Sequence, residues 1–398
     1  MRTVSKTVIG VDFGTQSARA VLVNAENGEI IYSCRKEYPY NSTPVPAIDC
    51  AENLPCATDY EMTLYELLRN VIPEEYRKTV AGICVDATSL TMVLLAEDGR
   101  ALSELDGWSE AAHARVKLWK YHRAQEKADE ALNLARNLQE PFLGRTGGSI
   151  SCEWMLPKLL EVRDEAPEIY SKIDLAMDLC EFLTFRLTGQ LVRSIGSLSY
   201  KCLWAEDLSF PERTFLNGLR AGFYEEYCHF LRGDVRKPGE CAGMLRSELT
   251  KRWGLPEQIP VATGMLDGHT SLATMGAFEP GDAALIVGTS NVCTVQDRKL
   301  QELKDVCGVA QDGMVIGSCG IDTGQSSTGN MLGWFVEHMA GWQIHREAEE
   351  RKISPHQVLA ERIQKPWENK VIAVDWWSGS RNAPCDLTLR GSMSGLEM

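Results

Sequence analysis

The 398-residue chain lacks several features, and each absence excludes a class of protein. It has no run of about 20 apolar residues, the length that a membrane-spanning helix needs. Acidic residues outnumber basic ones, 55 to 41, and the formal net charge of −14 leaves no broad basic surface for nucleic acid. The N-terminal MRTVSKTVIGVDFG enters a strand-like run at once and lacks the apolar core of a secretion signal. We therefore expect a cytoplasmic protein that binds neither nucleic acid nor membranes.

Disulfide and metal-binding patterns are also missing. The 13 cysteines form no CxxC pair, and an odd number of scattered cysteines is typical of reduced thiols in a cytosolic protein. The seven histidines include His113 and His122 on one helix-like pattern, yet no acidic or thiol side chain completes a ligand set around them. The sequence thus predicts no metal centre built from histidine and cysteine.

Length and composition indicate a folded protein of at least two domains. A chain of 398 residues exceeds the usual size of one domain, and 44% hydrophobic with 24% charged residues is typical of globular proteins. Apolar runs on either side of a glycine turn predict two strands between Val8 and Val23. Asn27-Gly28 predicts a tight turn into a third strand, so the chain is expected to begin with antiparallel strands.

The middle of the chain has a different pattern. Helical periodicity dominates from about 108 to 256, most clearly at 111–137 and 166–187. Strand patterns then return at 259–264, 283–288 and 292–296. Strands and helices in this arrangement predict α/β layers, in which helices cover the sheets.

Two stretches far apart share one pattern. VIGVDFGTQSARAVLV near the start and AALIVGTSNVCTVQ at 283–296 each place a Gly-Thr turn between two apolar strands. The backbone N–H groups and small hydroxyls of such turns suit phosphate oxygens. Asp12 would repel a phosphate, so a carboxylate before the turn makes sense where Mg²⁺ bridges it to the phosphates, directly or through water. The alternative is an ordinary hairpin whose Asp and Ser cap their own backbone.

Two other charged residues lie in apolar surroundings. Asp267, in LDGHT, follows a strand and a glycine turn and opens an apolar helix, where its carboxylate could accept a proton from a substrate hydroxyl. Its alternative role is that of a helix N-cap. Lys201 lies in the aromatic stretch SYKCLW, which is typical of a sugar site with aromatic walls and one placed charge. Alternatively, Lys201 lies at the edge of the core, with its aliphatic stem buried and its ammonium group in the solvent.

Together, nine segments in order resemble the FGGY carbohydrate kinases, and within that family the L-ribulokinases. The segments are GVDFGTQSARAVLV, HARVKLWKYHRAQ, GGSISCEWMLPKLLEVRDEAPEIY, LTGQLVRS, SYKCLW, GMLDGHTS, EPGDAALIVGTSN, TGQSSTG and DWWSGSRNAP. The resemblance implies an α/β protein with the actin-like (ribonuclease H-like), two-lobed ATPase fold. It implies an N-terminal lobe at 1–278, with a helical insertion at about 108–256, and a C-terminal lobe at 279–398.

The resemblance also implies roles for the matched residues. The implied reaction is ATP-dependent phosphorylation of L-ribulose to L-ribulose 5-phosphate, with Mg²⁺ as cofactor. Asp267 matches the catalytic base, and Asp12 matches the residue that holds Mg²⁺ through water. The residues matched to ATP phosphates are Gly14, Thr15 and Gln16 in the first turn and Gly288, Thr289 and Ser290 in the second. The residues matched to the ketopentose are Ala87, Lys201, Asp267 and Asp322.

Three departures from the family pattern limit this inference. Asp322 stands where ribulokinases usually carry a glutamate, and Gly268 replaces the alanine of their DAH motif, which loosens the start of a helix. The chain also ends at Met398, before the glycine-rich segment that holds adenine in the family. We therefore expect an incomplete second lobe, weak ATP binding and exposed apolar surface.

Other functions remain open at this point. One is a kinase for another ketose or polyol, such as D-ribulose or xylulose, and another is a truncated sugar-binding remnant with little kinase activity. An actin-like filament or chaperone ATPase would share the phosphate turns but does not explain SYKCLW. The expected partners are a small sugar and ATP, and a homodimer is compatible with all of these functions.

Overall fold

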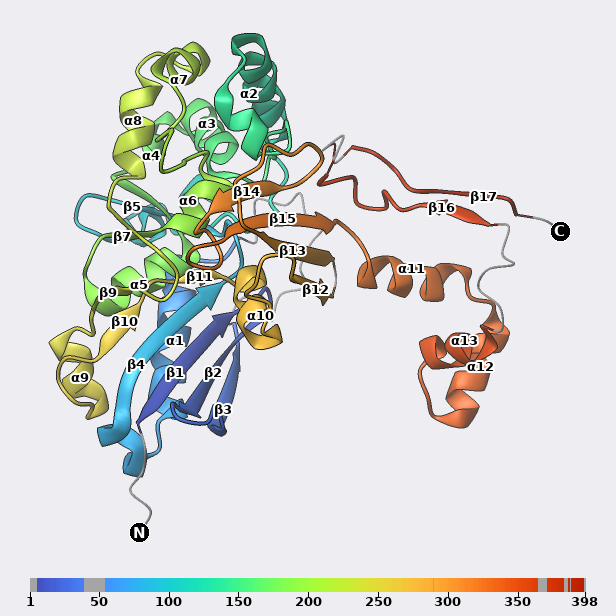
Figure 1. Ribbon diagram of the computed structural model, residues 1–398, viewed down its shortest axis with the longest axis horizontal. Coiled ribbons are helices and arrows are strands. Elements are labelled where there is room, and N and C mark those ends of the chain that lie inside the picture. The colour runs from blue at the N-terminus through green and yellow to red at the C-terminus, as the bar shows by residue number, and fades with distance from the viewer. Residues whose placement is uncertain are drawn as a thin grey trace.

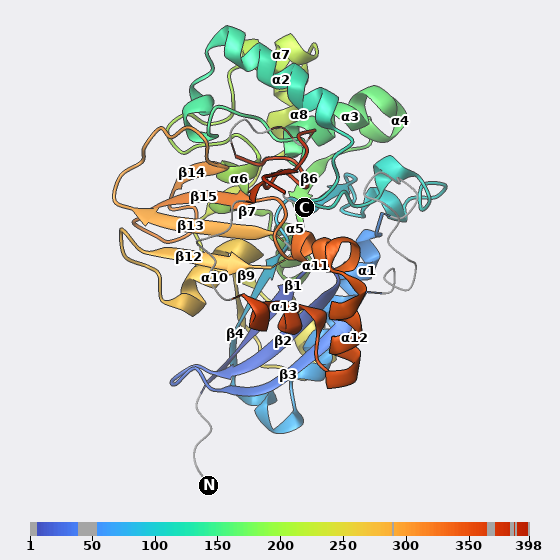
Figure 2. The ribbon, with the colours of Figure 1, turned by 90° about the vertical axis from the view of Figure 1, so that its right-hand side faces the viewer.

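The computed structural model describes residues 6–38, 54–288, 290–363, 371–382, 386 and 388–396. Two β-sheets lie beside each other, and a group of helices (α2, α3, α4, α7 and α8) packs at one end of the molecule (Figures 1 and 2). Within the described ranges, no helix is long and apolar enough to cross a membrane. No disulfide joins the cysteines of this part of the chain.

The first sheet contains the N-terminal strands. Its order is β3-β2-β1-β4-β10-β9, and β11 also pairs with β4. The strands are β1 (Thr7–Phe13), β2 (Ser17–Asn24), β3 (Ile30–Glu37), β4 (Val80–Ala87), β9 (Cys241–Met244), β10 (Pro260–Ala262) and β11 (Met265–Leu266). The first three strands are antiparallel, which confirms the prediction, whereas β4 runs parallel to β1, β10 and β11.

The core of this part follows from alternation along the strands. Ile9, Val11 and Phe13 are buried at every second position of β1. They share one core with the apolar face of helix α1 (Ala57–Val71), which packs on β2 and β3. The turn at Gly28 has a φ of +73°, a conformation that glycine adopts without strain.

The middle segment is mainly helical, but short strands interrupt it. Its helices are α2 (Gln125–Leu138), α3 (Met155–Glu165), α4 (Pro167–Tyr170), α5 (Leu179–Thr188), α6 (Ile195–Lys201), α7 (Arg213–Leu219), α8 (Phe223–Phe230) and α9 (Ser247–Trp253). The strands outside the first sheet are β5 (Met92–Leu95), β6 (Leu175–Asp178), β7 (Val192–Ser194) and β8 (Asp234–Arg236). Small side chains let α2 pack closely, since Ala128, Ala131 and Ala135 are fully buried on one face.

Two predicted helices in this segment were wrong in part. The helix predicted from residue 111 begins only at Gln125, because Lys117 exchanges two backbone hydrogen bonds with Met92, of 2.9 and 3.1 Å. The helix predicted at 166–187 is broken by β6, which pairs antiparallel with β5. In both places strand pairing with a distant segment outweighs the local helical pattern.

The second sheet is antiparallel throughout. Its order is β12-β13-β15-β14, with strands β12 (Ala283–Val287), β13 (Asn291–Asp297), β14 (Gly308–Gln311) and β15 (Cys319–Gln325). Helix α10 (Asp267–Met275) leads into it from the first sheet. The hairpin of β12 and β13 repeats the arrangement of β1 and β2, as the shared sequence pattern predicted.

The last elements extend away from both sheets (Figure 1). They are helices α11 (Gly329–Met339), α12 (Trp342–Arg351) and α13 (Pro355–Arg362) and the two-stranded pair of β16 (Ile372–Val374) and β17 (Ser392–Ser394). Large apolar side chains on these elements are exposed, among them Leu332, Trp334, Met339, Trp342 and Ile372. The predicted exposed apolar surface is therefore present here.

Helix α6 joins the helical segment to the second sheet through Tyr200. Its phenol oxygen donates a hydrogen bond of 2.7 Å to the carbonyl of Gly320. A Cβ placed on Gly308, Gly313 or Gly320 would lie 2.7, 2.6 or 2.5 Å from atoms of the Tyr200 side chain. The three glycines therefore leave the space that this side chain fills.

Residues 302–306 make a second contact between the helical segment and the region of the second sheet. Substitutions at two neighbouring glycines test this contact. Gly147 and Gly148 have φ values of +66° and +81°, so alanine at either position should cost about 1–2 kcal/mol of backbone strain. A Cβ on Gly147 would lie 2.1 Å from the carbonyl oxygen of Val306, whereas a Cβ on Gly148 meets no atom within 4 Å. We expect Gly147→Ala to lower the urea midpoint at least twice as far as Gly148→Ala, and equal losses would contradict this contact.

Candidate active site

Three carboxylates gather at one edge of the first sheet. Asp12 and Asp86 are paired in the parallel register of β1 and β4, and Asp267 follows β11, which pairs with β4 at Asp86 and Ala87. Burial, and next the carboxylate of Asp12, raise the pKa of Asp86 to about 8. Burial also raises the pKa of Asp267, although the Gly268 N–H opposes this. The cluster therefore favours a bound proton or cation.

Asp267 is the first residue of α10, and the N-cap position belongs to Leu266. The Asp267 carboxylate accepts a 2.7 Å hydrogen bond from the backbone N–H of Gly268. The alternative role of Asp267 as the helix N-cap is therefore wrong. Its side chain is fixed at the start of the helix and lies among the other acids instead.

In each of the two glycine turns, the glycine N–H is bonded to the carbonyl of a serine that follows it. Gly14 N–H donates to the carbonyl of Ser17 at 3.2 Å, and Gly288 N–H donates to that of Ser290 at 3.1 Å. A Cβ on Gly268 would lie 3.6 Å from Val292 in β13, so the start of α10 reaches the hairpin that carries the second turn. Thr289 lies outside the described residues.

Lys201 and Asp322 form a buried ion pair. Lys201 Nζ lies 3.2 Å from Asp322 Oδ2, and His269 Nε2 lies 3.7 Å from the same oxygen. Burial opposes the charged carboxylate, but Lys201 and His269 hold the pKa of Asp322 well below its usual range. The alternative in which Lys201 extends to the surface is wrong, since only 9% of the residue is exposed.

The positions of Gln16, Ala87 and Ser17 say less about ligand binding than those of the charged residues. Gln16 lies exposed in the first turn. Ala87 is fully buried at the end of β4, so the structure does not bring it to an open surface. Ser17 Oγ accepts a 3.0 Å hydrogen bond from Arg35 Nε, so this serine does not only cap its own turn.

The sequence analysis missed a chain of contacts beside these residues. Trp119 Nε1 donates a 3.1 Å hydrogen bond to Thr15 Oγ1 in the first turn. The guanidinium of Arg381 lies 5.0 Å from the centre of the Trp119 ring and donates a 3.1 Å hydrogen bond to Glu153. His122 completes the chain, because its Nε2 lies 3.0 Å from the same Glu153 oxygen.

No sequence spacing predicted this chain of contacts. His122 was expected to belong to no metal-ligand set, and its contact with Glu153 was not predicted because Glu153 is distant in sequence. Trp119 falls within the helix predicted at 111–137, but it lies in the non-helical stretch before α2. The mixture of aromatic and charged residues in WKYHR was the only available signal.

These residues provide complementary chemistry. The partly buried acids of the first sheet can hold a proton or a cation, and the first glycine turn, of a kind that suits anions, begins two residues after Asp12. Lys201 and Arg381 add positive charge, and Asp322, which also lies against His269, and Glu153 add hydrogen-bond acceptors. The region therefore suits a polar, hydroxyl-rich ligand next to an anionic one. In the described part of the chain, no three His, Cys, Asp or Glu side chains are arranged so that they alone could hold a metal ion.

Glu153→Gln should remove an acid-sensitive part of the stability. Burial opposes ionisation, but Arg381 and His122 lower the pKa of Glu153 to about 2, against about 4.3 for an ordinary glutamate. This stabilisation is fully present above about pH 4.3 and is lost as the pH falls towards 2. Urea unfolding should show the largest deficit for Glu153→Gln at pH 7 and a shrinking one below about pH 4. The exposed Glu97→Gln is the control, and a deficit independent of pH would contradict the pairing.

Known proteins resemble the chain over most of its length. Residues 7–275 match the N-terminal domain of the FGGY family of carbohydrate kinases. The ribulokinase of Mycolicibacterium smegmatis is 35% identical over 406 residues, which cover 98% of this chain and 71% of that protein. The ribulokinase of Halalkalibacterium halodurans is 32% identical over 401 residues, with the same coverage.

Solved structures agree on the fold. Xylulose kinase from Lactobacillus acidophilus superposes with a TM-score of 0.75 at 19% identity, covering 98% of this chain and 73% of that one. Gluconate kinase from the same organism gives a TM-score of 0.75 at 20% identity, with the same coverage. At such identities the likeness establishes the actin-like ATPase fold and no more. Together, the family match and the ribulokinase relatives establish that the chain is a carbohydrate kinase and belongs to the FGGY family.

Proposed function

We propose that this kinase phosphorylates a ketopentose, L-ribulose, to L-ribulose 5-phosphate, with ATP as the phosphoryl donor. The observation that carries the proposal is the buried pair of Lys201 and Asp322, which lies against His269, two residues after Asp267. Such a pair offers both donors and acceptors to sugar hydroxyls close to a carboxylate that can act as a base. The similarity to ribulokinases supports the choice of sugar.

Asp267 would act as the general base. Its carboxylate takes the proton of the terminal sugar hydroxyl as that oxygen forms a bond to the γ-phosphorus, and the bond from phosphorus to the β,γ-bridging oxygen breaks to release ADP. Burial raises the pKa of Asp267, which makes it a better proton acceptor than an exposed aspartate. Its hydrogen bond from Gly268 would hold the carboxylate in position.

The two glycine turns would hold the ATP phosphates between the proposed lobes, 1–278 and 279–398. Gly14, Thr15 and Gln16 would contribute from one side, and Gly288, Thr289 and Ser290 from the other. The residues present fit Mg²⁺, because Asp86 Oδ1 is buried without a hydrogen-bond partner among the described residues and lies beside Asp12. Asp12, through water, and Asp86 would hold this ion, which when bound would offset negative charge on the phosphates.

A second candidate is a kinase for another ketose or polyol. The Asp322 carboxylate is one methylene shorter than the glutamate typical of ribulokinases, and Lys201 and His269 both lie against it. A shorter acceptor favours a sugar with a different arrangement of hydroxyls. A panel of L-ribulose, D-ribulose, xylulose and polyols in a coupled ADP assay separates the two candidates.

Asp267→Asn should lower kcat for the best sugar about 10²–10⁴-fold, because it removes the proton acceptor. Sugar affinity, measured by calorimetry, should change only a few-fold, because the amide keeps the size of the side chain. Asp98→Asn, at an exposed position that pairs with Arg100, is the matched control and should keep full activity. An Asp267→Asn enzyme with wild-type kcat would refute the role as base.

A double substitution should separate the structural and sugar-binding roles of Lys201 and Asp322. Lys201→Met alone leaves a buried carboxylate without its main partner, which should cost about 3–5 kcal/mol of stability. Lys201→Met combined with Asp322→Leu should recover most of that loss, because an apolar pair can replace a buried ion pair. Sugar affinity should stay at least about 10-fold weaker in the double variant, a loss of about 1.4 kcal/mol. Recovery of affinity together with stability would show that the pair only supports the fold.

A further inference from the structure

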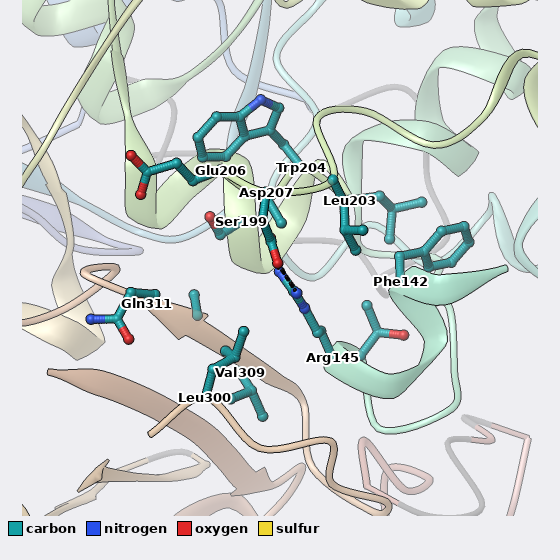
Figure 3. Close-up of a pocket in the computed structure, with 14 residues that line it drawn as sticks. Phe142, Arg145, Ser199, Leu203, Trp204, Glu206, Asp207, Leu300, Val309 and Gln311 are labelled. Carbon is teal, nitrogen blue, oxygen red and sulfur yellow. Dashed lines mark hydrogen bonds and ion pairs between the residues drawn. The ribbon is translucent and has the colours of Figure 1, made fainter. Parts of the chain in front are cut away.

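A cavity lies between the end of α6 with the turn that follows it and strand β14. Its volume is about 510 Å³, within the usual range for small-ligand sites. One wall comes from the helical segment, through the 3₁₀ helix Pro141–Arg145 and the turn after α6, and the other comes from β14 and the residue Leu300. Figure 3 shows the side chains that line it. Lys201 and Asp322 are not among them, so the cavity is distinct from the candidate active site.

Most of the residues that line the cavity are apolar, and several of them are held in place by packing against the rest of the protein. Phe142, Leu203 and Val309 are each at most 5% exposed. The ring of Phe142 packs on Phe215 with centroids 5.3 Å apart, and Val309 is fixed by pairing of β14 with β15. Trp204 adds an aromatic surface. Such a wall offers contact area to an apolar group but would leave most sugar hydroxyls without partners.

The polar lining forms two groups, Arg145 with Asp207 on one side and Ser199, Glu206 and Gln311 on the other, and the only cationic side chain among the lining residues is Arg145. Its Nη1 and Nη2 donate hydrogen bonds of 2.6 and 2.7 Å to the two carboxylate oxygens of Asp207. Both residues line the cavity, but the Asp207 side chain is 62% exposed and that of Arg145 only 19%, so the carboxylate is the more solvent-exposed member of the pair. An exposed ion pair of this kind is weak, and a ligand carboxylate or phosphate can therefore replace Asp207 in the same two-bond geometry.

A neighbouring hydroxyl adds an independent observation. Thr146, the next residue along the chain, lines the same cavity and is only 4% exposed. Its Oγ1 is buried and has no hydrogen-bond partner among the described residues. A buried hydroxyl without a partner is costly unless something binds it, so it indicates a second polar contact for a ligand beside Arg145.

We propose that this cavity is a second binding site, for a small amphipathic anion that carries a carboxylate or phosphate on an aromatic or branched apolar group. The anion replaces Asp207 on Arg145 and accepts a hydrogen bond from Thr146, while the apolar group packs between Trp204, Leu203 and Val309. The site does not depend on which sugar the kinase phosphorylates.

The test uses the whole chain and two fluorinated probes, 4-fluorophenyl phosphate and 4-fluorophenylacetate, followed by ¹⁹F NMR. At least one should bind saturably with a Kd of about 1 mM or below, as expected for a ligand of this size. The stronger of the two identifies the anion that the site prefers. Binding of neither probe, or equal binding of neutral 4-fluorobenzyl alcohol or inorganic phosphate, would overturn the proposal.

Variants locate the bound probe. Arg145→Gln should weaken binding about 10-fold, whereas Arg213→Gln, at an exposed arginine paired with Glu225, should not. Asp207→Asn should strengthen binding several-fold, because it removes the competing carboxylate, and a gain of affinity cannot come from misfolding. Equal affinity in all three variants, or displacement of the probe by L-ribulose or ATP, would place the probe elsewhere and overturn the proposal.

Discussion

The burial of like charges at one sheet edge is the constraint on which the site depends. Asp12 and Asp86 end two neighbouring parallel strands in register, and Asp267 follows a third strand paired with the same β4. Parallel pairing forces their side chains to one edge, and burial there makes three negative charges unfavourable without a proton or a cation. The first glycine turn, of a kind that suits phosphate oxygens, follows Asp12 at this edge. A fold that concentrates acids in this way is suited to chemistry in which anionic phosphates arrive together with a cation.

Much of the fold could be predicted from local patterns. The first three strands and the repeated strand-turn-strand units follow from apolar alternation, and the turn between β2 and β3 follows from Gly28, which accepts positive φ. The predictions failed where a distant partner decides the conformation. Residues around Lys117 have helical periodicity but pair with Met92, and β6 lies within a predicted helix because β5 offers it backbone hydrogen bonds. Local sequence contains no information about such partners.

The site was predictable only where it lies on short motifs. Asp12 and Asp267 stand next to glycine turns, so their positions follow from neighbouring residues. The ion pair of Lys201 with Asp322 joins segments that no spacing relates, and the resemblance to a family matched each residue to a sugar contact without predicting the pair. The contact of Arg381 with Trp119 and Glu153 was missed, because the three residues meet only after the chain has folded. Long-range electrostatic pairs are therefore the part of the site that sequence patterns reveal least.

The tight packing around the Tyr200 side chain restricts the order in which neighbouring residues can be substituted during evolution. Each of Gly308, Gly313 and Gly320 leaves space that the tyrosine side chain occupies. A larger residue at any one of them is tolerated only after position 200 has become smaller. Once a glycine has been replaced, a return to tyrosine is blocked in turn. These four positions therefore form one evolutionary unit, in which the history of the first substitution determines which later ones are accessible.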